Sequence, residues 1–212
     1  MDQIKLIEDS LLKVELGLRN LPSDIHTYTG YSGSYTREFY NRICSTPNCS
    51  YLEIGTWYGS SSISALYGNT VNATFIDNWS QFGGNKNILI NALEKYKGNS
   101  TYRLVEGDCW KVDTTQLPQY DVYLYDGAHT YSDQYNAIVK YYDCLKNNCI
   151  IMVDDWNWPD VQNGTRDGFK KVGANIIYSK EIVLPKSDTI GMPNHKGKNT
   201  WWNGIGIFVI SK

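Results

Sequence analysis

Short runs of β-branched, aromatic and other apolar residues alternate along most of the chain with segments of helical periodicity. Seven such runs predict strands, at 51–54, 73–77, 101–107, 121–126, 149–155, 174–179 and 204–211. Apolar positions three or four residues apart predict helices between them, at 60–68, 86–96, 132–145 and about 164–172. Alternating strands and helices are typical of βαβ units, whose right-handed crossovers place helices on both faces of a parallel sheet. The pattern therefore predicts an α/β, Rossmann-like, doubly wound fold with a seven-stranded sheet.

The first part of the chain lacks this alternation. Residues 2–18 place their apolar positions on one helical face, and a second helix is predicted at 36–44. A Gly/Ser/Tyr-rich stretch at 28–35 precedes that second helix and is either a plain connection or a substrate lid. We expect 1–48 to form a helical or lid segment and 49–212 to form the main domain, together making one globular unit.

The last two predicted strands are separated by a long segment rich in Pro, Gly, Lys and Asn, at 184–203, instead of by a helix. A connection of this kind is typical of a hairpin, whose strands run antiparallel. We therefore expect a mostly parallel sheet with an antiparallel C-terminal strand. Aromatic residues near the two irregular segments could stack on a sugar or aromatic ring, or could be packing residues: Tyr31, Tyr35, Trp201 and Trp202.

Composition excludes several classes of protein. The chain has 212 residues, of which 42% are hydrophobic and 20% are charged, so it can bury the core of one ordinary domain. The formal net charge is -2 and no basic stripe is visible, so we expect no nucleic-acid partner. No apolar run is long enough to span a bilayer, and the amphipathic, acidic start does not resemble a signal peptide. We expect a cytoplasmic protein with no membrane partner.

The five cysteines form no C-x-x-C pair. Cys44 with Cys49 and Cys144 with Cys149 share one spacing, and Cys109 stands alone. A disulfide or a zinc site is the alternative to reduced thiols. Because zinc sites usually show tighter Cys or His pairs, we expect reduced thiols.

The residues after each predicted strand are the candidates for ligand binding, since ligands of open α/β sheets lie beyond the carboxyl ends of the strands. The first strand is followed by a loop from Gly55 to Ser61. Gly55 allows the backbone to turn and approach a ligand, and Gly59 opens the next helix, whose N-terminus offers free N–H groups to a carboxylate. No Lys-Ser/Thr pair follows, so the loop is not a phosphate-binding P-loop.

Acidic residues follow the next two predicted strands. Asp77 is placed to bind ribose hydroxyls, as in dinucleotide-binding folds, and Asp108 follows the third strand beside an aromatic residue, Trp110. Either carboxylate alone could simply cap a strand end. The succession of one glycine-containing and two acidic strand ends favours a ligand site.

Three carboxylates and a histidine follow the fourth and fifth predicted strands. Asp126, Asp154 and Asp155 would repel one another on adjacent strand ends, and an oxygen-preferring divalent cation such as Mg²⁺ removes that cost. His129 lies three residues after Asp126, where a neutral imidazole could take a proton from a metal-bound substrate hydroxyl. The alternative is that the acids cap helices and the histidine is structural.

Tryptophan is concentrated just after the predicted strands. The chain has seven Trp, and five of them occupy such positions: Trp57, Trp79, Trp110, Trp156 and Trp158. This placement predicts an aromatic-lined pocket for an adenine ring or a planar substrate. Contact with a protein partner is the competing explanation.

Two motifs in these strand ends resemble a known family. The segment from Glu53 to Ser61 (EIGTWYGSS) is similar to the first motif of class I methyltransferases that use S-adenosylmethionine (SAM), especially the small metal-dependent O-methyltransferases. The segment 126–131 (DGAHTY), with Asp154-Asp155, resembles that of macrocin-type O-methyltransferases, which act on macrolide sugars. Trp57 stands where many class I members have a third glycine. The resemblance covers about 50–155.

The resemblance implies a role for each strand end. Gly55 and its motif would hold the methionine part of SAM, Asp77 the ribose, and Asp108 would lie near the adenine. Mg²⁺ or another divalent cation would be held by Asp126, Asp154 and Asp155, and His129 would be the general base where catechol-type relatives carry Lys. The candidate cofactor-binding residues are Glu53, Gly55, Thr56, Trp57, Gly59, Ser61, Asp77, Asn78, Trp79, Asp108, Cys109, Trp110 and Asp126.

On this basis we expect a class I methyltransferase fold that transfers the SAM methyl group to a hydroxyl of a small molecule, either a sugar or a phenol. An NAD(P)-dependent oxidoreductase would share the glycine loop and Asp77, but it should show Gly-x-Gly-x-x-Gly, which is absent from the chain. A catalytically silent SAM-fold binding module would have no reason to keep the acids and His129. The expected partner is a hydroxylated small molecule, and a homo-oligomer is compatible with the sequence.

Overall fold

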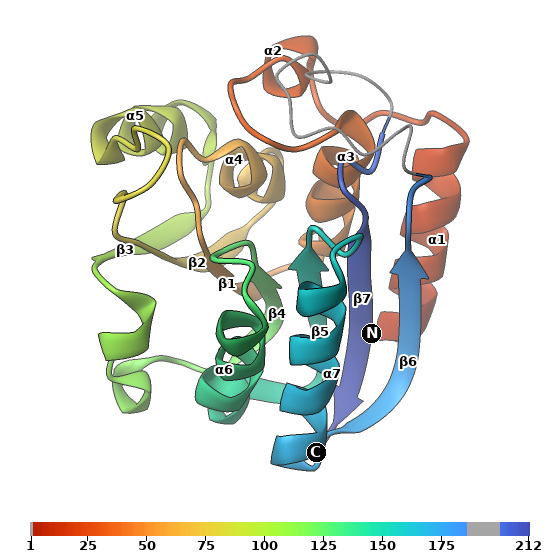
Figure 1. The fold of residues 1–212 in the computed structure, drawn as a ribbon. Coiled ribbons are helices and arrows are strands. Elements are labelled where there is room, and N and C mark those ends of the chain that lie inside the picture. The colour runs from red at the N-terminus through yellow and green to blue at the C-terminus, as the bar shows by residue number, and fades with distance from the viewer. Residues whose placement is uncertain (1, 186–199) are drawn as a thin grey trace.

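The computed structural model describes residues 2–185 and 200–212, so much of the predicted 184–203 connection lies outside the described residues. Seven strands form one sheet in the order β3-β2-β1-β4-β5-β7-β6, as Figure 1 shows. The strands are β1 (Cys49–Ile54), β2 (Val71–Asp77), β3 (Thr101–Glu106), β4 (Tyr120–Tyr125), β5 (Leu145–Asp154), β6 (Asn175–Ile182) and β7 (Ile205–Ser211).

The strand directions confirm the predicted sheet. Strands β1 to β5 run parallel to one another, and β7 pairs antiparallel with both β5 and β6. The strand order reverses at β1, because β2 and β3 lie on one side of it and β4 and β5 on the other. Such a reversal opens a crevice at the carboxyl ends of the strands, where open α/β sheets bind ligands.

Helices cover both faces of the sheet (Figure 1). Apolar side chains of α1, α3, α4 and α5 pack in one core, and those of α6 and α7 pack in a second core on the opposite face. Short helices lie in the connections: α2 (Ser23–His26) and the 3₁₀ turns Cys109–Lys111, Thr114–Gln116 and Tyr142–Cys144. The longer helices are α1 (Gln3–Glu15), α3 (Ser34–Ile43), α4 (Ser60–Leu66), α5 (Lys86–Tyr96), α6 (Tyr131–Tyr141) and α7 (Pro159–Val172).

The sheet has a core on each face because successive side chains along its central strands point to opposite faces. Tyr51 of β1 and Leu124 of β4 belong to the core beneath α1, α3, α4 and α5. Their chain neighbours Leu52 and Tyr123 belong to the core beneath α6 and α7. Because successive strand side chains point to opposite faces, a strand buried on both sides reads as a continuous apolar run. The central strands were predictable for that reason.

Several element boundaries differ from the predicted ones, and one short helix was not predicted. Helix α7 begins at Pro159 instead of about 164, because proline suits the first helical turn, where its missing N–H has no intrahelical partner. Strand β5 begins at Leu145 instead of 149, and its pairing with β4 is irregular between Tyr120 and Val122. Helix α2 was not predicted, since four residues are too few for a periodic signal.

Within 2–185 and 200–212, no helix combines the length and the apolar character that crossing a membrane requires. All five cysteines carry free thiols, and four of them are buried.

Candidate active site

A cavity of about 690 Å³ opens at the carboxyl ends of the parallel strands. Pockets that bind small molecules commonly have volumes of about 300–1,000 Å³. The walls of the cavity come from the loops that follow β1 to β5, from Tyr31 and from the pair Trp202 and Asn203. The cavity therefore lies where the sequence predicts the ligand site.

Most of the predicted cofactor-binding residues line this cavity. Glu53 and Gly59 are the exceptions, and both lie just beneath its surface. His129 and Asp155 also line the cavity, whereas Asp154 does not. The cofactor residues that line it are Gly55, Thr56, Trp57, Ser61, Asp77, Asn78, Trp79, Asp108, Cys109, Trp110 and Asp126.

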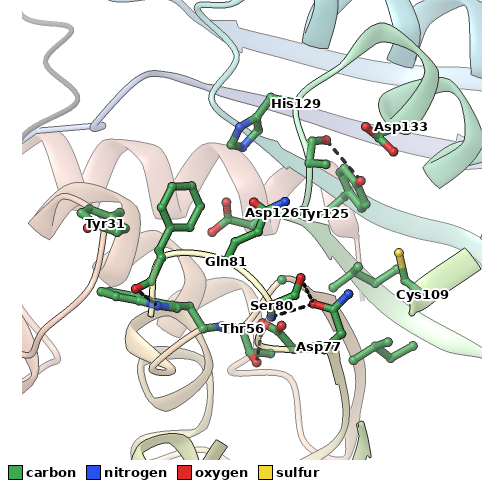
Figure 2. A pocket seen from close by; sticks show the side chains of 18 of the residues that line it. Tyr31, Thr56, Asp77, Ser80, Gln81, Cys109, Tyr125, Asp126, His129 and Asp133 are labelled. Atoms are coloured by element: carbon green, nitrogen blue, oxygen red, sulfur yellow. Dashed lines mark hydrogen bonds between the residues drawn. The ribbon is translucent and has the colours of Figure 1, made fainter. Parts of the chain in front are cut away.

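Asp77 joins the loops after β1 and β2. Its Oδ2 accepts hydrogen bonds from the Trp57 N–H at 2.7 Å and from the Thr56 hydroxyl at 3.3 Å. Its Oδ1 accepts from the Trp79 N–H at 2.7 Å. Figure 2 shows Thr56 and Asp77 side by side at one end of the cavity. The carboxylate thus fixes both loops and still faces the cavity, where its remaining lone pairs can accept from a ligand.

Gly55 is required for the ends of β1 and β4 to meet. Its φ is +89°, and a Cβ placed on it would lie 1.9 Å from the backbone oxygen of Asp126. The Asp126 N–H donates to the Ile54 carbonyl at 2.9 Å, which holds the two strand ends together. The sequence predicted that Gly55 allows close approach to a ligand. The structure shows a close approach to the protein's own backbone at the same point.

We expect Gly55→Ala to lower the free energy of unfolding by at least about 2 kcal/mol, since it combines a strained φ with a backbone clash. Gly68→Ala is a matched control, because Gly68 has φ +69° with nothing within 4 Å of its Cβ position. Urea denaturation of the two variants measures the difference. Equal losses in the two variants would show that the contact with Asp126 relaxes without cost.

Glu53 is fully buried beneath the glycine loop. Its carboxyl accepts hydrogen bonds from the Ser61 hydroxyl at 2.5 Å and from the Tyr51 hydroxyl at 3.0 Å. Burial raises the pKa of Glu53 to about 7, although these hydrogen bonds act in the opposite direction. Glu53 therefore positions Ser61, which faces the cavity, from inside the protein.

Replacing Glu53 with glutamine should flatten the dependence of stability on pH. Because the folded state holds the proton of Glu53 more tightly than the unfolded state, the free energy of unfolding falls as pH rises from about 4.5 to about 7. This shift corresponds to about 3 kcal/mol, which Glu53→Gln removes. Urea denaturation across this range measures the slope, with the exposed Glu15→Gln as a control. An unchanged slope in Glu53→Gln would show that this carboxyl is ionised throughout.

The loop after β3 forms the far end of the cavity. Asp108 caps the short turn that follows, since its Oδ1 accepts from the Trp110 N–H at 2.9 Å. Trp110 lies with its ring centroid 6.4 Å from that of Tyr125, and Cys109 lines the same end. This end of the cavity is therefore more apolar than the end where Asp77 lies.

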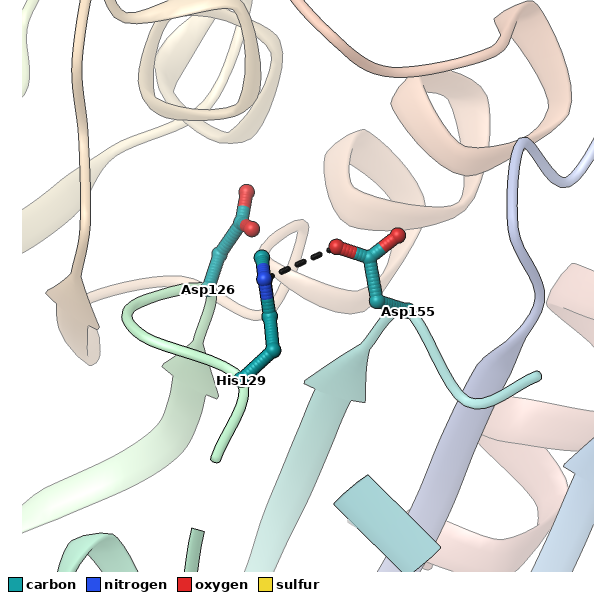
Figure 3. A group of neighbouring side chains, drawn as sticks. All are labelled: Asp126, His129 and Asp155. Atoms are coloured by element: carbon teal, nitrogen blue, oxygen red, sulfur yellow. Dashed lines mark ion pairs between the residues drawn. The ribbon is translucent and has the colours of Figure 1, made fainter. Parts of the chain in front are cut away.

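Asp126, His129 and Asp155 meet at the cavity wall from the ends of β4 and β5, as Figure 3 shows. One ligand atom from each lies within 4.8 Å of the others. The Nε2 atom of His129 lies 2.8 Å from Oδ2 of Asp155, and the side-chain amide of Asn203 donates to Oδ1 of Asp155 at 2.6 Å. Among the described residues, this is the one group of three or more acidic, His or Cys side chains with metal-ligand spacing.

Asp154 is buried next to that group. It is 3% exposed, does not line the cavity and is not among the three clustered residues. Burial and the charge of Asp155 raise the pKa of Asp154 well above its usual range. Burial also raises the pKa of Asp126 well above that of an ordinary aspartate, and the charges of Asp154 and Asp155 add to the effect. This part of the site favours either a bound proton or a bound cation.

Four of the five tryptophans that follow predicted strands line the cavity: Trp57, Trp79, Trp110 and Trp158. The expectation is wrong for Trp156, which is fully buried in the core beneath α6 and α7. Its ring lies 5.3 Å from that of Phe208, over Gly206, where any side chain would collide with it.

The sequence analysis missed several residues that line the cavity. Ser80, Gln81 and Phe82 follow β2 in a loop whose fold has no periodic signal. Asn203 was missed as well, although its position was predictable from topology. Because β7 runs antiparallel to β5, the start of β7 lies beside the end of β5, where Asp155 follows.

The model of a methyltransferase-domain family matches residues 52–156, the span that contains the strand ends described above. The chain belongs to this methyltransferase-domain family and has the class I methyltransferase fold. This assignment sets aside the oxidoreductase alternative. No curated protein matches the sequence of this chain.

Solved structures share the fold of this methyltransferase at low sequence identity. A Streptococcus mutans protein assigned to the SAM-dependent methyltransferases is 15% identical with a TM-score of 0.56, over 84% of this chain and 47% of its own. An O-methyltransferase from Bacillus cereus in complex with SAH is 17% identical with a TM-score of 0.51, over 98% of this chain and 91% of its own. The O-methyltransferase TomG from Streptomyces achromogenes, in complex with SAM, is 12% identical with a TM-score of 0.52, covering 100% of both.

The methyltransferase described here thus spans about half the length of some of its solved relatives. It matches others from end to end.

Proposed function

We propose that the chain is a metal-assisted O-methyltransferase that acts on a hydroxyl of a small molecule. The observation that supports this most is the meeting of Asp126, His129 and Asp155 on the wall of a cavity whose other end has the features of a nucleoside site. Solved O-methyltransferases of similar length support the same reaction class. Among them is TomG, which takes part in tomaymycin synthesis.

The loops after β1 to β3 would hold SAM. Gly55 and Ser61 would face its methionine part, Asp77 would accept hydrogen bonds from the ribose hydroxyls, and Trp110 and Cys109 would contact the adenine. In this order the sulfonium methyl group would lie toward Asp126, between the cofactor loops and the metal cluster. Asp126 lies between the two halves of the site, because it ends the central strand β4.

The clustered residues fit a divalent cation of the Mg²⁺ class. Carboxylate oxygens are the ligands that such hard cations prefer, and a cation would offset the mutual repulsion of Asp126 and Asp155. Asp154 would act from behind them as a further negative charge. When bound, the cation would lower the pKa of the acceptor hydroxyl.

His129 would remove the proton from the acceptor hydroxyl. Asp155 lies 2.8 Å from its Nε2, and the Trp158 ring packs edge-on against its ring with the centroids 4.6 Å apart. Both contacts fix the orientation of the imidazole. Thr130, the residue after this histidine, is the N-cap of α6, and its hydroxyl accepts from the Asp133 N–H. The start of the helix is thus fixed next to His129. Once the proton is removed, the remaining task is to hold the hydroxylate and the methyl group in line.

Calorimetric titration with SAM and with Mg²⁺ tests the proposal. The metal-assisted enzyme binds both ligands, and Asp155→Asn binds SAM as the wild type does but binds Mg²⁺ at least about tenfold more weakly. Binding of SAM without any binding of Mg²⁺ would indicate a simpler methyltransferase. If neither ligand binds, the domain is a silent module and the proposal is wrong.

A further inference from the structure

Four aromatic side chains from four separate segments form one surface of the cavity wall. We call Tyr31, Trp57, Phe82 and Trp202 the aromatic wall. The ring of Tyr31 stacks on Trp57 with centroids 4.7 Å apart, and it lies 6.1 Å from the rings of both Phe82 and Trp202. In Figure 2, Tyr31 lies on the opposite side of Asp126 from Cys109. The Tyr31 side of the aromatic wall therefore lies away from the adenine end of the cavity.

Two side chains of the aromatic wall are exposed and three have a strained backbone, which packing alone does not explain. Tyr31 is 44% exposed and Phe82 is 69% exposed, although large apolar side chains are usually buried. Trp57, Phe82 and Trp202 have φ values of +45°, +53° and +57°, a region that bulky residues rarely adopt. Strain of this kind collects at ligand sites, where the surrounding structure holds side chains in the orientation that binding requires.

Contacts with Arg37 and with α4 hold the segment that carries Tyr31 in place. Arg37 is fully buried, and its guanidinium donates to the carbonyls of Ile25 at 2.6 Å and Tyr28 at 2.9 Å. Gly30 packs so closely on α4 that a Cβ there would lie 2.0 Å from the hydroxyl oxygen of Ser60. The Tyr31 ring is therefore presented to the cavity by a fixed segment.

The charged residues that line the cavity all favour a neutral or cationic acceptor. The carboxylates that face the cavity are Asp77, Asp108, Asp126, Asp133 and Asp155. No Lys or Arg lines the cavity among the described residues. A divalent cation at Asp126 and Asp155 and the sulfonium of SAM would offset part of this charge. An anionic acceptor would still meet net repulsion.

Resting on the proposed O-methyltransferase function, we propose that the acceptor is a hydroxylated ring that carries no phosphate or carboxylate and lies flat against the aromatic wall. Aromatic rings bind flat apolar faces by stacking, and they bind cationic amines through their π-faces. A ring with a free amine or no charge can stack on the aromatic wall and is not repelled by the carboxylates of the cavity. A phosphorylated or carboxylated ring can stack on the wall, but the carboxylates repel it.

Three catechols that differ mainly in charge test the proposal. Dopamine is cationic, ethylcatechol is neutral and dihydroxyphenylacetate is anionic. We expect the full chain, saturated with SAH and Mg²⁺, to bind dopamine and ethylcatechol at least about tenfold more tightly than dihydroxyphenylacetate in calorimetry at low salt. Anion binding that is equal or tighter would overturn the proposal, and so would the absence of binding by both of the other catechols.

Substitutions then locate the binding surface. Tyr31→Ala and Phe82→Ala should each weaken ethylcatechol binding about tenfold, and Tyr31→Ala, which lies outside the loops after β1 to β3, should leave SAH affinity unchanged. Tyr131→Ala is the control, because Tyr131 is similarly exposed at 40% but does not line the cavity. Unchanged ethylcatechol binding in both wall variants would overturn the proposal. If the wild type binds no SAM or no Mg²⁺, the proposed O-methyltransferase function is wrong. That result is distinct from a failure of the acceptor proposal, which is measured by catechol binding.

Discussion

Replacing His129 with alanine should lower turnover by about 10²- to 10⁴-fold, the usual contribution of a general base. The affinity for SAM should stay nearly unchanged, because His129 lies in the metal half of the cavity, away from Asp77 and Cys109. The acceptor hydroxyl would lose the group that takes its proton, while the loops that hold the cofactor keep their hydrogen bonds. Steady-state kinetics together with SAM calorimetry measure both quantities.

The same variant separates a general base from a metal ligand. Since one imidazole nitrogen of His129 lies within 4.8 Å of the Asp126 and Asp155 ligand atoms, the imidazole is also placed to bind the cation itself. If it is the base, His129→Ala keeps the wild-type affinity for Mg²⁺. Loss of Mg²⁺ affinity in the variant would assign the imidazole to the metal, and wild-type turnover would exclude both roles.

Removing divalent cations should abolish turnover, and adding Mg²⁺ back should restore it. Without the cation, the hydroxyl loses the charge that lowers its pKa, and Asp126 and Asp155 repel one another. Asp126→Asn and Asp155→Asn should each lower the affinity for Mg²⁺ by at least about tenfold, because each removes an anionic ligand. Metal-dependent initial rates after dialysis against a chelator measure the effect.

Asp160→Asn provides the control for those two variants. Asp160 is exposed in the first turn of α7, close to the cavity in sequence but outside its lining. It should retain the wild-type dependence on Mg²⁺. Full activity of the wild type after thorough chelation would refute the role of a metal, and the cofactor half of the site would be unaffected by that result.

The sheet was largely predictable from the sequence because its central strands are buried on both faces. Such strands are continuous apolar runs, and the helices between them carry a periodic stripe. The position of the site followed from the same pattern, since Gly55, Asp77 and Asp126 all stand at carboxyl ends of parallel strands. A strand-end rule therefore placed most of the cavity without any knowledge of tertiary structure.

The remaining site residues depend on contacts that sequence patterns do not encode. Phe82 lies in a loop without periodicity, and its place beside Tyr31 follows from tertiary structure alone. Trp156 shows the opposite limit. It stands at a strand end like Trp158, yet it turns into the core because Gly206 leaves room for its ring. Position along the chain predicted the neighbourhood of each aromatic side chain but not its direction.

The place of β7 in the sheet has a consequence for the order of folding. Among the described residues, strand β6 pairs only with β7. Until β7 docks, β6 has no partner and the edge of β5 is open. Trp202 and Asn203 stand just before β7 and join the cavity only as β7 docks between the two strands. The loops after β1 to β3 can therefore form first, whereas the wall that Trp202 and Asn203 contribute can assemble only after β7 is in place.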